Sequence, residues 1–585
     1  MADLEELPTM ADYVAPVRDI NLALDVAGID QILAYPHFAH VDRAVITDLV
    51  SEFGRFVATE LGPLNRVGDR EHSRLDAATG VVTTPTGFKD AYAKYVAAGW
   101  GAVPFPTEYG GGAFPWTIAI AFQEMLTSAN MGFSLCPLLT QGAIDALLHH
   151  GSEEQRETYL RHMVSGEWTG TMNLTEPGAG SDVGALISRA LPEADGSWRI
   201  FGQKIFITYG EHDMAANQVH LVLARLPDAP PGTKGVSLFL VPKFLVNADG
   251  TLGARNDARC VSIEHKMGIN ASPTCVMSYG DTGGGAIGWM IGEPNTGMRA
   301  MFTMMNNARL SVGLEGLAMA ERAYQDAYAY AIERVQGRPI GGALGDAIVG
   351  HPDVRRMLLT MRSQIQAMRG LVYLNAASLD HSRHGATDEA RRHGSELADL
   401  LTPLSKAWCT DLGVELTSIA VQIFGGMGYV EETGVAQHYR DSRIAPIYEG
   451  TNGIQALDLV GRKLAMCGGD VVRGLLEEVA VWAAENHATT LLSAESTIRL
   501  ATEWILAQED PTNPMAGATP YLRALATVIG GWQLGRQGAA SGGPEQAMFT
   551  FYCEQILPSV DGLCRQATAG AANMMAPSVA DLASR

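Results

Sequence analysis

Basic side chains are scarce in this 585-residue sequence: 42 lysines and arginines stand against 64 aspartates and glutamates, a formal net charge of −22. An acidic surface of this kind repels phosphates, so we expect no nucleic acid partner. Charged residues of both signs make up only 18% of the chain. That fraction is low for a fully exposed surface, and we therefore expect an oligomer in which another subunit covers apolar surface.

Cysteine is also scarce and shows no pattern. The seven cysteines form no CxxC motif, which predicts neither a disulfide framework nor a structural zinc site and favours a reducing compartment. Two pairs of polar neighbours, His149 with His150 and Glu211 with His212, fall into no HExxH or related ligand pattern. We expect no metal site.

Long hydrophobic runs are absent as well. Segments such as VHLVLA and VSLFLVP have the length of strands, and we expect none to reach the roughly 18 residues of a membrane-spanning helix. The opening decapeptide MADLEELPTM is acidic where a signal peptide is basic. We therefore expect a cytoplasmic protein with no transmembrane segment.

Apolar residues, at 47% of the chain, are abundant enough for a large core, and the length allows three or four domains. Helical periodicity dominates up to residue 165, where Ser152 and Gln155 predict a capping box. Short β-rich runs separated by PGAG, NADG and DTGGG turns follow from 166 to 295. The predicted helices of this first half span 39–61, 86–98, 116–129 and 139–150, with a further helix after Ser152 that ends at Gly166.

Helical periodicity returns after the β-rich segment, so the predicted order is α, β, α. Gly468 and Gly469 mark the start of a final helical extension. Helices are predicted at about 297–334, 352–384, 387–423 and 453–466, and in the extension at 471–508, 519–540 and 544–573. The predicted domains are an N-terminal extension (1–35), an N-terminal helical domain (36–165), a β domain (166–295), a C-terminal helical domain (296–467) and the helical extension (468–585).

Two patches in the β domain have the composition of binding sites. The loop TEPGAGSDVG at 175–184 is glycine-rich, but Pro177 and the lack of a strand–turn–helix context argue against a dinucleotide fingerprint. A simple tight turn and a loop that binds the polar edge of a heterocycle both remain open. In KIFIT, strand alternation places Phe206 and Thr208 on one face, either as an aromatic platform or as an ordinary half-buried strand.

Two further patches lie in the C-terminal half. QIFGGMGYVEE at 422–432 is a glycine-rich turn that allows a ligand close to the backbone. In IYEGTNGIQALDLV, Glu449 precedes Gly450, Thr451 and Asn452, candidate caps of a helix. The expected inner face of that helix consists of Ile454, Leu457 and Leu464. A glutamate at a helix start most often serves the helix dipole, so this position alone does not predict catalysis.

Together and in this order, these segments resemble the acyl-CoA dehydrogenase family over roughly residues 36–465. NLTEPGAGSDVGA is similar to its first signature, with Asn173 at a position where a small residue or cysteine is usual. QIFGGMGYVEETGVAQHYRD is similar to its second, with Gln437 in place of a basic residue. The stretch YVAPVRDINLAL and the C-terminal extension most resemble the bacterial group around 3-methylmercaptopropionyl-CoA dehydrogenase. The resemblance implies an α+β, mainly α fold with an N-terminal helical domain, a central β domain, a C-terminal four-helix bundle and an extra helical domain.

The resemblance implies an FAD site that a dimer completes. Leu174 and Thr175 would bind the flavin pyrimidine edge, and Phe206 takes the position of the family's tryptophan on the isoalloxazine. The implied contacts are Met172, Leu174, Thr175, Gly180, Ser181, Phe206, Ile207, Thr208, Thr451, Asn452 and Gly453 in one subunit, and Arg334, Gln336, Gln422, Gly425 and Gly426 toward the FAD of the neighbouring subunit.

For the substrate, the resemblance implies contacts by Ser181, Asn306, Arg309, Tyr448 and Gly450. Asn306 stands where the family has aspartate, and an ordinary helix face is the alternative reading of the short match MNNAR. Glu449 aligns with the catalytic base, which argues against isovaleryl-type members, whose base lies on an earlier helix. We expect the bottom of the acyl pocket to come from helices within 86–150, near Tyr448.

The implied activity is FAD-dependent α,β-dehydrogenation of an acyl-CoA to the trans-2-enoyl-CoA, as in fatty acid β-oxidation. Glu449 would remove the α-proton, flavin N5 would take the β-hydride, and an electron-transferring flavoprotein would receive the electrons. An acyl-CoA oxidase that uses oxygen and a non-catalytic acyl-CoA or flavin-binding component are the alternatives. Methylthio-propionyl, short, medium and long acyl groups are all compatible with the sequence.

Overall fold

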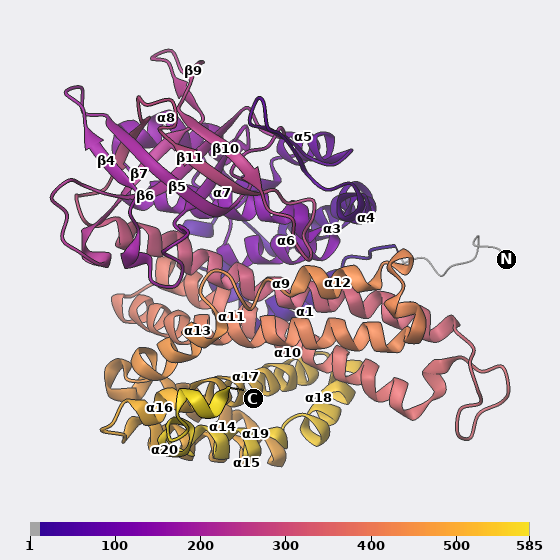
Figure 1. Cartoon of the computed structure of the whole chain (residues 1–585). Helices are drawn as coiled ribbons and strands as arrows, with labels where there is room; N and C mark the ends of the chain where they lie inside the picture. Colours follow the sequence, from indigo (N-terminus) through magenta and orange to yellow (C-terminus); the bar gives the residue numbers. More distant parts are fainter. Residues whose placement is uncertain (1–11, 584–585) are drawn as a thin grey trace. The chain divides into compact units, whose positions relative to one another are not determined.

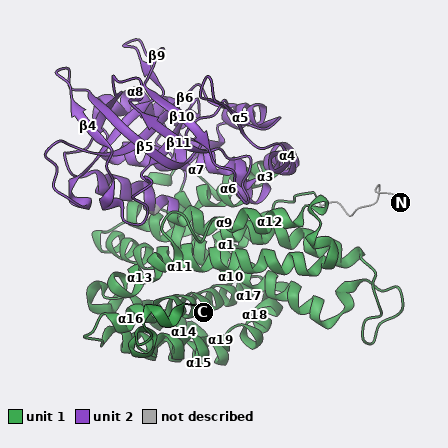
Figure 2. Cartoon of the chain, viewed as in Figure 1, with its two compact units in different colours: residues 1–54, 115–124, 309–585 green, residues 55–114, 125–308 purple. Residues whose placement is uncertain are grey.

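The computed structural model describes residues 12–583, apart from the side chain of Asn306 (Figure 1). The chain divides into two compact units, each assembled from segments far apart in sequence (Figure 2). Unit 1 comprises residues 1–54, 115–124 and 309–585, and unit 2 comprises residues 55–114 and 125–308. The predicted N-terminal extension begins, with residues 1–11, outside the described part.

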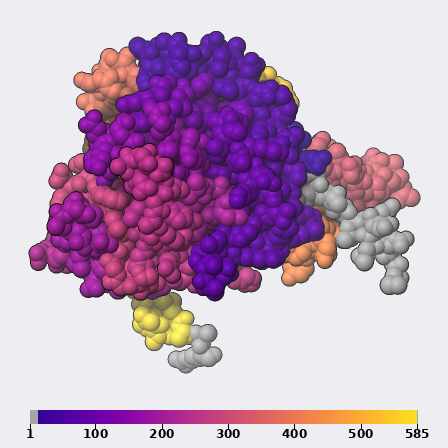
Figure 3. Space-filling view, turned by 90° about the horizontal axis from the view of Figure 1, so that it is seen from above, coloured from indigo at the N-terminus to yellow at the C-terminus, as the bar shows by residue number. Residues whose placement is uncertain are grey.

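Unit 2 is built on an eight-stranded sheet. Its strands run in the order β10-β11-β5-β12-β7-β6-β3, with β4 pairing to β5 and β6. Most pairs are antiparallel, but β3 runs parallel to β6 in the register Trp168↔Asn217. The strands are β3 (Trp168–Asn173), β4 (Arg189–Pro192), β5 (Trp198–Thr208), β6 (Asn217–Arg225), β7 (Val236–Pro242), β10 (Ala258–Ile263), β11 (Thr274–Tyr279) and β12 (Ala286–Ile291), beside a hairpin of β8 (Phe244–Val246) and β9 (Leu252–Arg255). In Figure 3 the earlier residues of this unit (indigo to violet) border its later residues (magenta to pink).

Two helices of unit 2 pack on this sheet: α7 and α8 lie against β3, and α7 also contacts β5. The capping box is confirmed: Ser152 accepts from the Gln155 N–H and the Gln155 side chain accepts from the Ser152 N–H. The helices of this unit are a π-helical turn (Val57–Leu61), α4 (Gly62–Glu71), α5 (Phe88–Ala97), α7 (Met131–His150) and α8 (Glu153–Ser165), whereas α3 (Arg43–Phe56), α6 (Trp116–Ala129) and α9 (Gly297–Glu333) cross between the two units.

Two expectations for this half were wrong. The region before residue 165 is not wholly helical, because β1 (Arg74–Asp76) pairs with β2 (Val81–Thr83). Helix α7 begins at Met131 rather than 139, since Asn130 caps it and the helix continues through Pro137. Within the described chain, α7 is also the one helix long and apolar enough to span a membrane, although 89% of its most apolar window is buried inside the protein, as in a core helix.

Unit 1 is helical. Helices α10 and α11 pack along each other, and α17 of the C-terminal extension packs on both. Its helices are α1 (Val17–Ala27), α2 (Ile29–Leu33), α10 (Pro352–His384), α11 (Asp388–Ile423), α12 (Val435–Ser442), α13 (Asn452–Asp458), α14 (Asp470–Glu485), α15 (Thr489–Leu506), α16 (Thr512–Ala516), α17 (Ala518–Ser541), α18 (Pro544–Gln555), α19 (Ser559–Ala567) and α20 (Ala572–Met575). The run predicted at 471–508 is two helices, because His487 adopts a positive φ of 55° between them.

A buried ionic cluster ties four helices of this unit together. Arg369 of α10 is fully buried and donates to Glu124 of α6 at 2.8 Å and to Glu321 of α9 at 3.0 Å. Arg362, two turns of α10 earlier along the same face, donates to Asp19 of α1 at 2.5 Å. Because Glu124 and Glu321 are also buried, these charges neutralise one another out of contact with water.

Candidate active site

Glu449 lies in a turn whose backbone few residues adopt. Its φ is 54° and that of Gly450 is 88°. A bulky L residue with positive φ is costly, and such residues are kept where the surrounding structure fixes them, often at functional sites. The φ of Gly450 favours glycine at this position, and a Cβ there would also lie 2.7 Å from the amide nitrogen of the Gln455 side chain.

Helix α13 begins directly after this turn. Thr451 is its N-cap, as predicted, and its hydroxyl accepts from the Ile454 N–H at 3.2 Å. The predicted inner face was partly wrong: Leu464 is buried, but Ile454 and Leu457 are 41% and 39% exposed. The reason is that α13 passes into a π-helical turn, Leu459–Lys463, which changes the side-chain phase.

Two cations affect the pKa of the Glu449 carboxyl. Burial raises the pKa of the Glu449 carboxyl to about 7, and the positive charges of Arg309 on α9 and Lys406 on α11 oppose that rise. Burial lowers the pKa of Lys406 to about 8. A carboxyl with a pKa near neutrality is suited to general base catalysis, because it is largely free to accept a proton yet remains basic.

A second carboxyl, Glu315 of α9, lies close to this turn and was missed by the sequence analysis. It accepts a hydrogen bond from the Tyr448 hydroxyl at 2.5 Å. Burial raises its pKa to about 8, and the negative charge of Glu449 contributes to that rise. Glu315 is the one acidic residue in the run LSVGLEGLAMA, and Lys406 is the one charge in LTPLSKAWC. An isolated ionisable residue in an apolar helix was the signal that could have revealed both.

Helices α9 and α11 come unusually close at this point. A Cβ at Gly313 would lie 2.4 Å from the Ser405 carbonyl oxygen, and one at Gly316 would lie 2.0 Å from that of Cys409. Only glycine permits such an approach of two backbones. Gly313 and Gly316 lie on either side of Glu315 in α9. The residues they approach, Ser405 and Cys409, lie on either side of Lys406 in α11. The close crossing of the two helices therefore brings Glu315 and Lys406 near each other.

The side chain of Asn452 is held by the protein itself. Its amide oxygen accepts from Lys406 Nζ at 2.8 Å, and its amide nitrogen donates to the Asp411 carboxylate at 2.7 Å and the Ala407 carbonyl at 3.0 Å. These contacts fix the residue to α11. The contacts with FAD expected for Thr451, Asn452 and Gly453 stay a prediction.

In unit 2 the structure brings the two predicted β-domain patches together. The Ile205 N–H donates to the Thr175 carbonyl at 2.9 Å. Lys204 Nζ donates to the Leu174 carbonyl at 3.0 Å and to the Glu176 carboxylate at 2.7 Å. This ion pair is buried, and sequence reasoning missed it although both residues lie in the motifs quoted above. It anchors the 174–181 loop to β5.

Phe206 has the geometry of an aromatic platform. Its φ is 61° and its side chain is 58% exposed, which is unusual for a large apolar residue in a strand. A shift of register in the β5–β11 pairing, between Lys204 and Ile207, places a bulge at this position. Gly178 and Gly180 in the adjoining loop have open space at their Cβ positions. An exposed ring beside a bare loop fits a flat heterocycle such as a flavin.

The residues expected to reach a neighbouring subunit form a second group, in unit 1. The Tyr330 ring of α9 stacks on Phe424 at the end of α11, with centroids 4.2 Å apart. This contact links the segment after α9, with Arg334 and Gln336, to the turn after α11, with Gln422, Gly425 and Gly426, all of them exposed. Gly425 and Gly426 have open space at their Cβ positions. Their contact with FAD stays a prediction.

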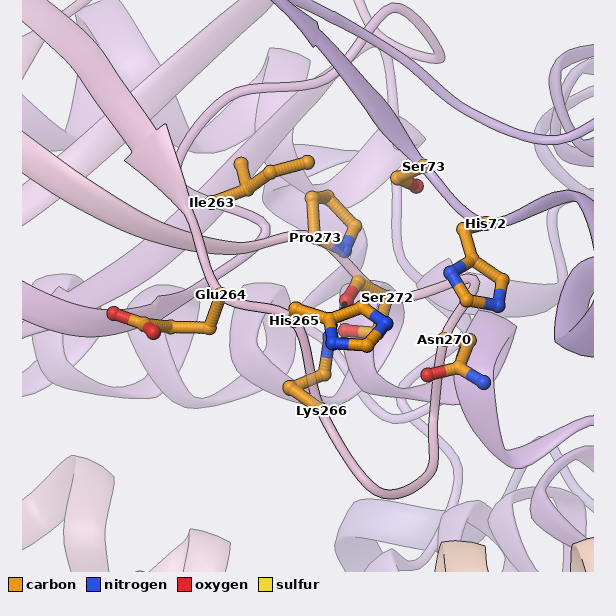
Figure 4. Close-up of a pocket in the computed structure, with 9 residues that line it drawn as sticks. All are labelled: His72, Ser73, Ile263, Glu264, His265, Lys266, Asn270, Ser272 and Pro273. Atoms are coloured by element: carbon orange, nitrogen blue, oxygen red, sulfur yellow. Dashed lines mark hydrogen bonds between the residues drawn. The ribbon is translucent and has the colours of Figure 1, made fainter.

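The remaining predicted residues lie in the same two units. Met172 and Leu174 are buried at the end of β3, and Ser181 is exposed. The side chain of Asn306 lies outside the described part. Figure 4 shows a pocket of unit 2 that none of the predicted residues lines; it is formed by His72, Ser73, Ile263, Glu264, His265, Lys266, Asn270, Ser272 and Pro273.

Family models match nearly the whole chain. Those of the acyl-CoA dehydrogenase N-terminal, middle and C-terminal domains match residues 47–167, 171–282 and 295–465. A further model, described as acetyl-CoA dehydrogenase C-terminal like, matches residues 470–578.

Individual proteins agree with the models. The chain is 46% identical to 3-methylmercaptopropionyl-CoA dehydrogenase of Ruegeria pomeroyi, over 90% of this chain and 91% of that protein. It is 37% identical to a butyryl-CoA dehydrogenase of Syntrophomonas wolfei, over 83% and 81%. An acyl-CoA dehydrogenase of Bacillus anthracis, solved in complex with FAD, superposes with a TM-score of 0.70 at 20% identity, over 90% of this chain and 88% of that one. This chain is an oxidoreductase that belongs to the acyl-CoA dehydrogenase family.

Proposed function

We propose that the enzyme oxidises a short-chain acyl-CoA to the trans-2-enoyl-CoA, with Glu449 as the base, and passes the electrons to an electron-transferring flavoprotein. The observation that carries this proposal is Glu449 itself: a buried carboxyl in a strained turn, with a pKa of about 7, that feels the positive charges of Arg309 and Lys406. The names of the two relatives above, a 3-methylmercaptopropionyl-CoA and a butyryl-CoA dehydrogenase, favour a short acyl group with or without a thioether.

The cofactor of the enzyme is FAD, which supplies the acceptor for the β-hydride. Glu449 removes the α-proton of the thioester, and its backbone N–H donates to the thioester carbonyl as negative charge develops there. Phe206 and the 174–181 loop would hold the flavin ring, and Thr175, Ile207 and Thr208 would contact its polar edge. The protein thus orients the thioester and holds the proton while the flavin accepts the electrons.

We further propose a cytoplasmic homodimer in which Arg334, Gln336, Gln422, Gly425 and Gly426 contact the FAD of the neighbouring subunit. The exposure of these residues in the single chain supports this arrangement. The seven cysteines, all free thiols, support a reducing location.

Anaerobic mixing of the purified enzyme with acyl-CoA thioesters tests the reaction. We expect butyryl-CoA and 3-methylmercaptopropionyl-CoA to bleach the flavin fastest, with rates falling by at least about tenfold for long chains. Turnover should require an electron-transferring flavoprotein. Rapid reoxidation of the bleached enzyme by air would instead identify an oxidase, and no bleaching by any acyl-CoA would contradict the proposal.

The pH dependence of bleaching follows from the pKa of Glu449. Only the ionised carboxylate accepts the α-proton, so the rate should rise with pH and reach half its maximum near pH 7. Replacing Lys406 with methionine removes a positive charge that favours the carboxylate, so the midpoint should move to higher pH, by about one unit. Lys89→Met, on an exposed face of α5, is the control. An unchanged midpoint in Lys406→Met would show that Lys406 does not act on the base.

A further inference from the structure

Glu315 is a buried carboxyl that the proposed chemistry does not use. Its side chain is 1% exposed. One carboxylate oxygen accepts from the Tyr448 hydroxyl, and the other is buried without a hydrogen-bond partner among the described residues. A buried carboxyl with an unpaired oxygen costs free energy, so a merely structural position would favour an apolar residue. We therefore expect Glu315 to have a role beyond packing.

The location of Glu315 suggests that function. Tyr448, to which it is bonded, immediately precedes Glu449. On the other side of Glu449, Asn452 is bonded to Lys406, Asp411 and Ala407 of α11. The turn that carries the base is therefore attached to α9 before Glu449 and to α11 after it.

We propose that Glu315 is a positioning residue for Glu449, and that its hydrogen bond to Tyr448 is the α9 half of a clamp that keeps the base in its left-handed turn. This inference rests on the proposed role of Glu449. The turn needs such a clamp because a glutamate at φ 54° relaxes readily to ordinary backbone angles when its neighbours are released. A displacement of about 1 Å at a reacting group is enough to lower a rate by about a hundredfold.

The clamp is rigid because of the helix crossing beneath it. Gly313 and Gly316 allow α9 to lie against α11, so the two anchors of the turn belong to helices in direct backbone contact. The groups that bear on the turn from these helices are Arg309 and Glu315 on α9 and Lys406 and Asp411 on α11. The anchoring hydrogen bond to Glu315 needs only an acceptor oxygen, and a neutral amide can supply it.

Four variants of the FAD-loaded enzyme test the proposal: Glu315→Leu, Glu315→Gln, Tyr448→Phe and the double variant Glu315→Leu/Tyr448→Phe. The measured quantities are the flavin-bleaching rate at saturating butyryl-CoA, the affinity for butyryl-CoA, the FAD content and the melting temperature. We expect Glu315→Leu to lower the bleaching rate by 10- to 100-fold with affinity and FAD content within about threefold of wild type. Glu315→Gln retains the acceptor and should stay within about threefold of the wild-type rate.

The double variant shows whether Glu315 and Tyr448 act through their shared hydrogen bond or affect the rate independently. If both residues act through one hydrogen bond, the double variant should bleach about as slowly as the slower single variant, whereas independent effects would multiply. A wild-type rate in Glu315→Leu, multiplying losses in the double variant, or a Glu315→Gln as slow as Glu315→Leu would each overturn the clamp. A fully active Glu449→Gln would instead overturn the base itself, so the two failures are distinguishable.

Discussion

Replacing Glu449 with glutamine should lower the rate of flavin bleaching by acyl-CoA at least about a thousandfold while the protein remains folded and yellow. Glutamine has the shape of glutamate, so it can occupy the same turn at φ 54°. Its amide accepts no proton at neutral pH, so the α-proton has no acceptor. The measurement is the anaerobic decay of oxidised-flavin absorbance after mixing with saturating acyl-CoA.

The matched control is Glu389→Gln, the same change at an exposed position near the start of α11. It should bleach at the wild-type rate. Binding of acyl-CoA to Glu449→Gln, followed by the perturbation of the flavin spectrum, should stay within about tenfold of wild type, since the side chain acts on the reaction more than on affinity. A bleaching rate within tenfold of wild type would rule out Glu449 as the base.

The largest effect on stability is expected at the buried ionic cluster. Arg369→Met should destabilise the protein by about 3–5 kcal/mol, because it leaves Glu124 buried without its cation and removes the shorter of the two ion pairs of Glu321, which keeps only Arg362 at 3.6 Å. The shape of the arginine stem is largely kept, so lost packing contributes little. Thermal unfolding of the FAD-loaded protein, followed by circular dichroism, measures the effect as a lower melting temperature.

Arg356→Met is the control on the same helix. Arg356 pairs with Asp353 at 2.8 Å, and both side chains are largely exposed. Water already solvates these charges, so the loss should be below about 1 kcal/mol. Equal shifts of the melting temperature in the two variants would show that the buried ion pairs of Arg369 stabilise the protein no more than an exposed ion pair does.

Strong periodicity made the long helices predictable. The bounds predicted for α6 and α10 agree with the structure, where Pro352 occupies the first position of α10 and defines its start. The hairpin of β1 and β2 was not predicted from the sequence, because each strand has three residues and so short a strand shows no alternation of apolar and polar residues. Helix α7 was cut short in the prediction because Pro137 normally ends a helix, whereas here the buried environment overrides that preference.

The parts of the site that depend on neighbouring residues in the sequence could be predicted. Thr451 as a cap and the proximity of IYEGT to a helix start follow from neighbouring residues. The apolar surroundings single out Glu315 and Lys406 in the sequence, but the partners of these residues, like the Lys204–Glu176 ion pair, lie 28 to 133 residues away and cannot be found from a local pattern. The positive φ of Phe206 likewise arises from a register shift with a distant strand.

The contacts of helix α1 join the two ends of the chain. Arg18 binds the buried Glu545 at 2.6 and 2.9 Å, across 527 residues, and Arg536 of α17 donates to the Val26 carbonyl at 2.7 Å. During synthesis the first helix therefore leaves the ribosome long before its partners on α17 and α18 exist. Its docking waits until α17 and α18 have been made, so a chain released earlier cannot form these contacts and leaves exposed the surface that they cover.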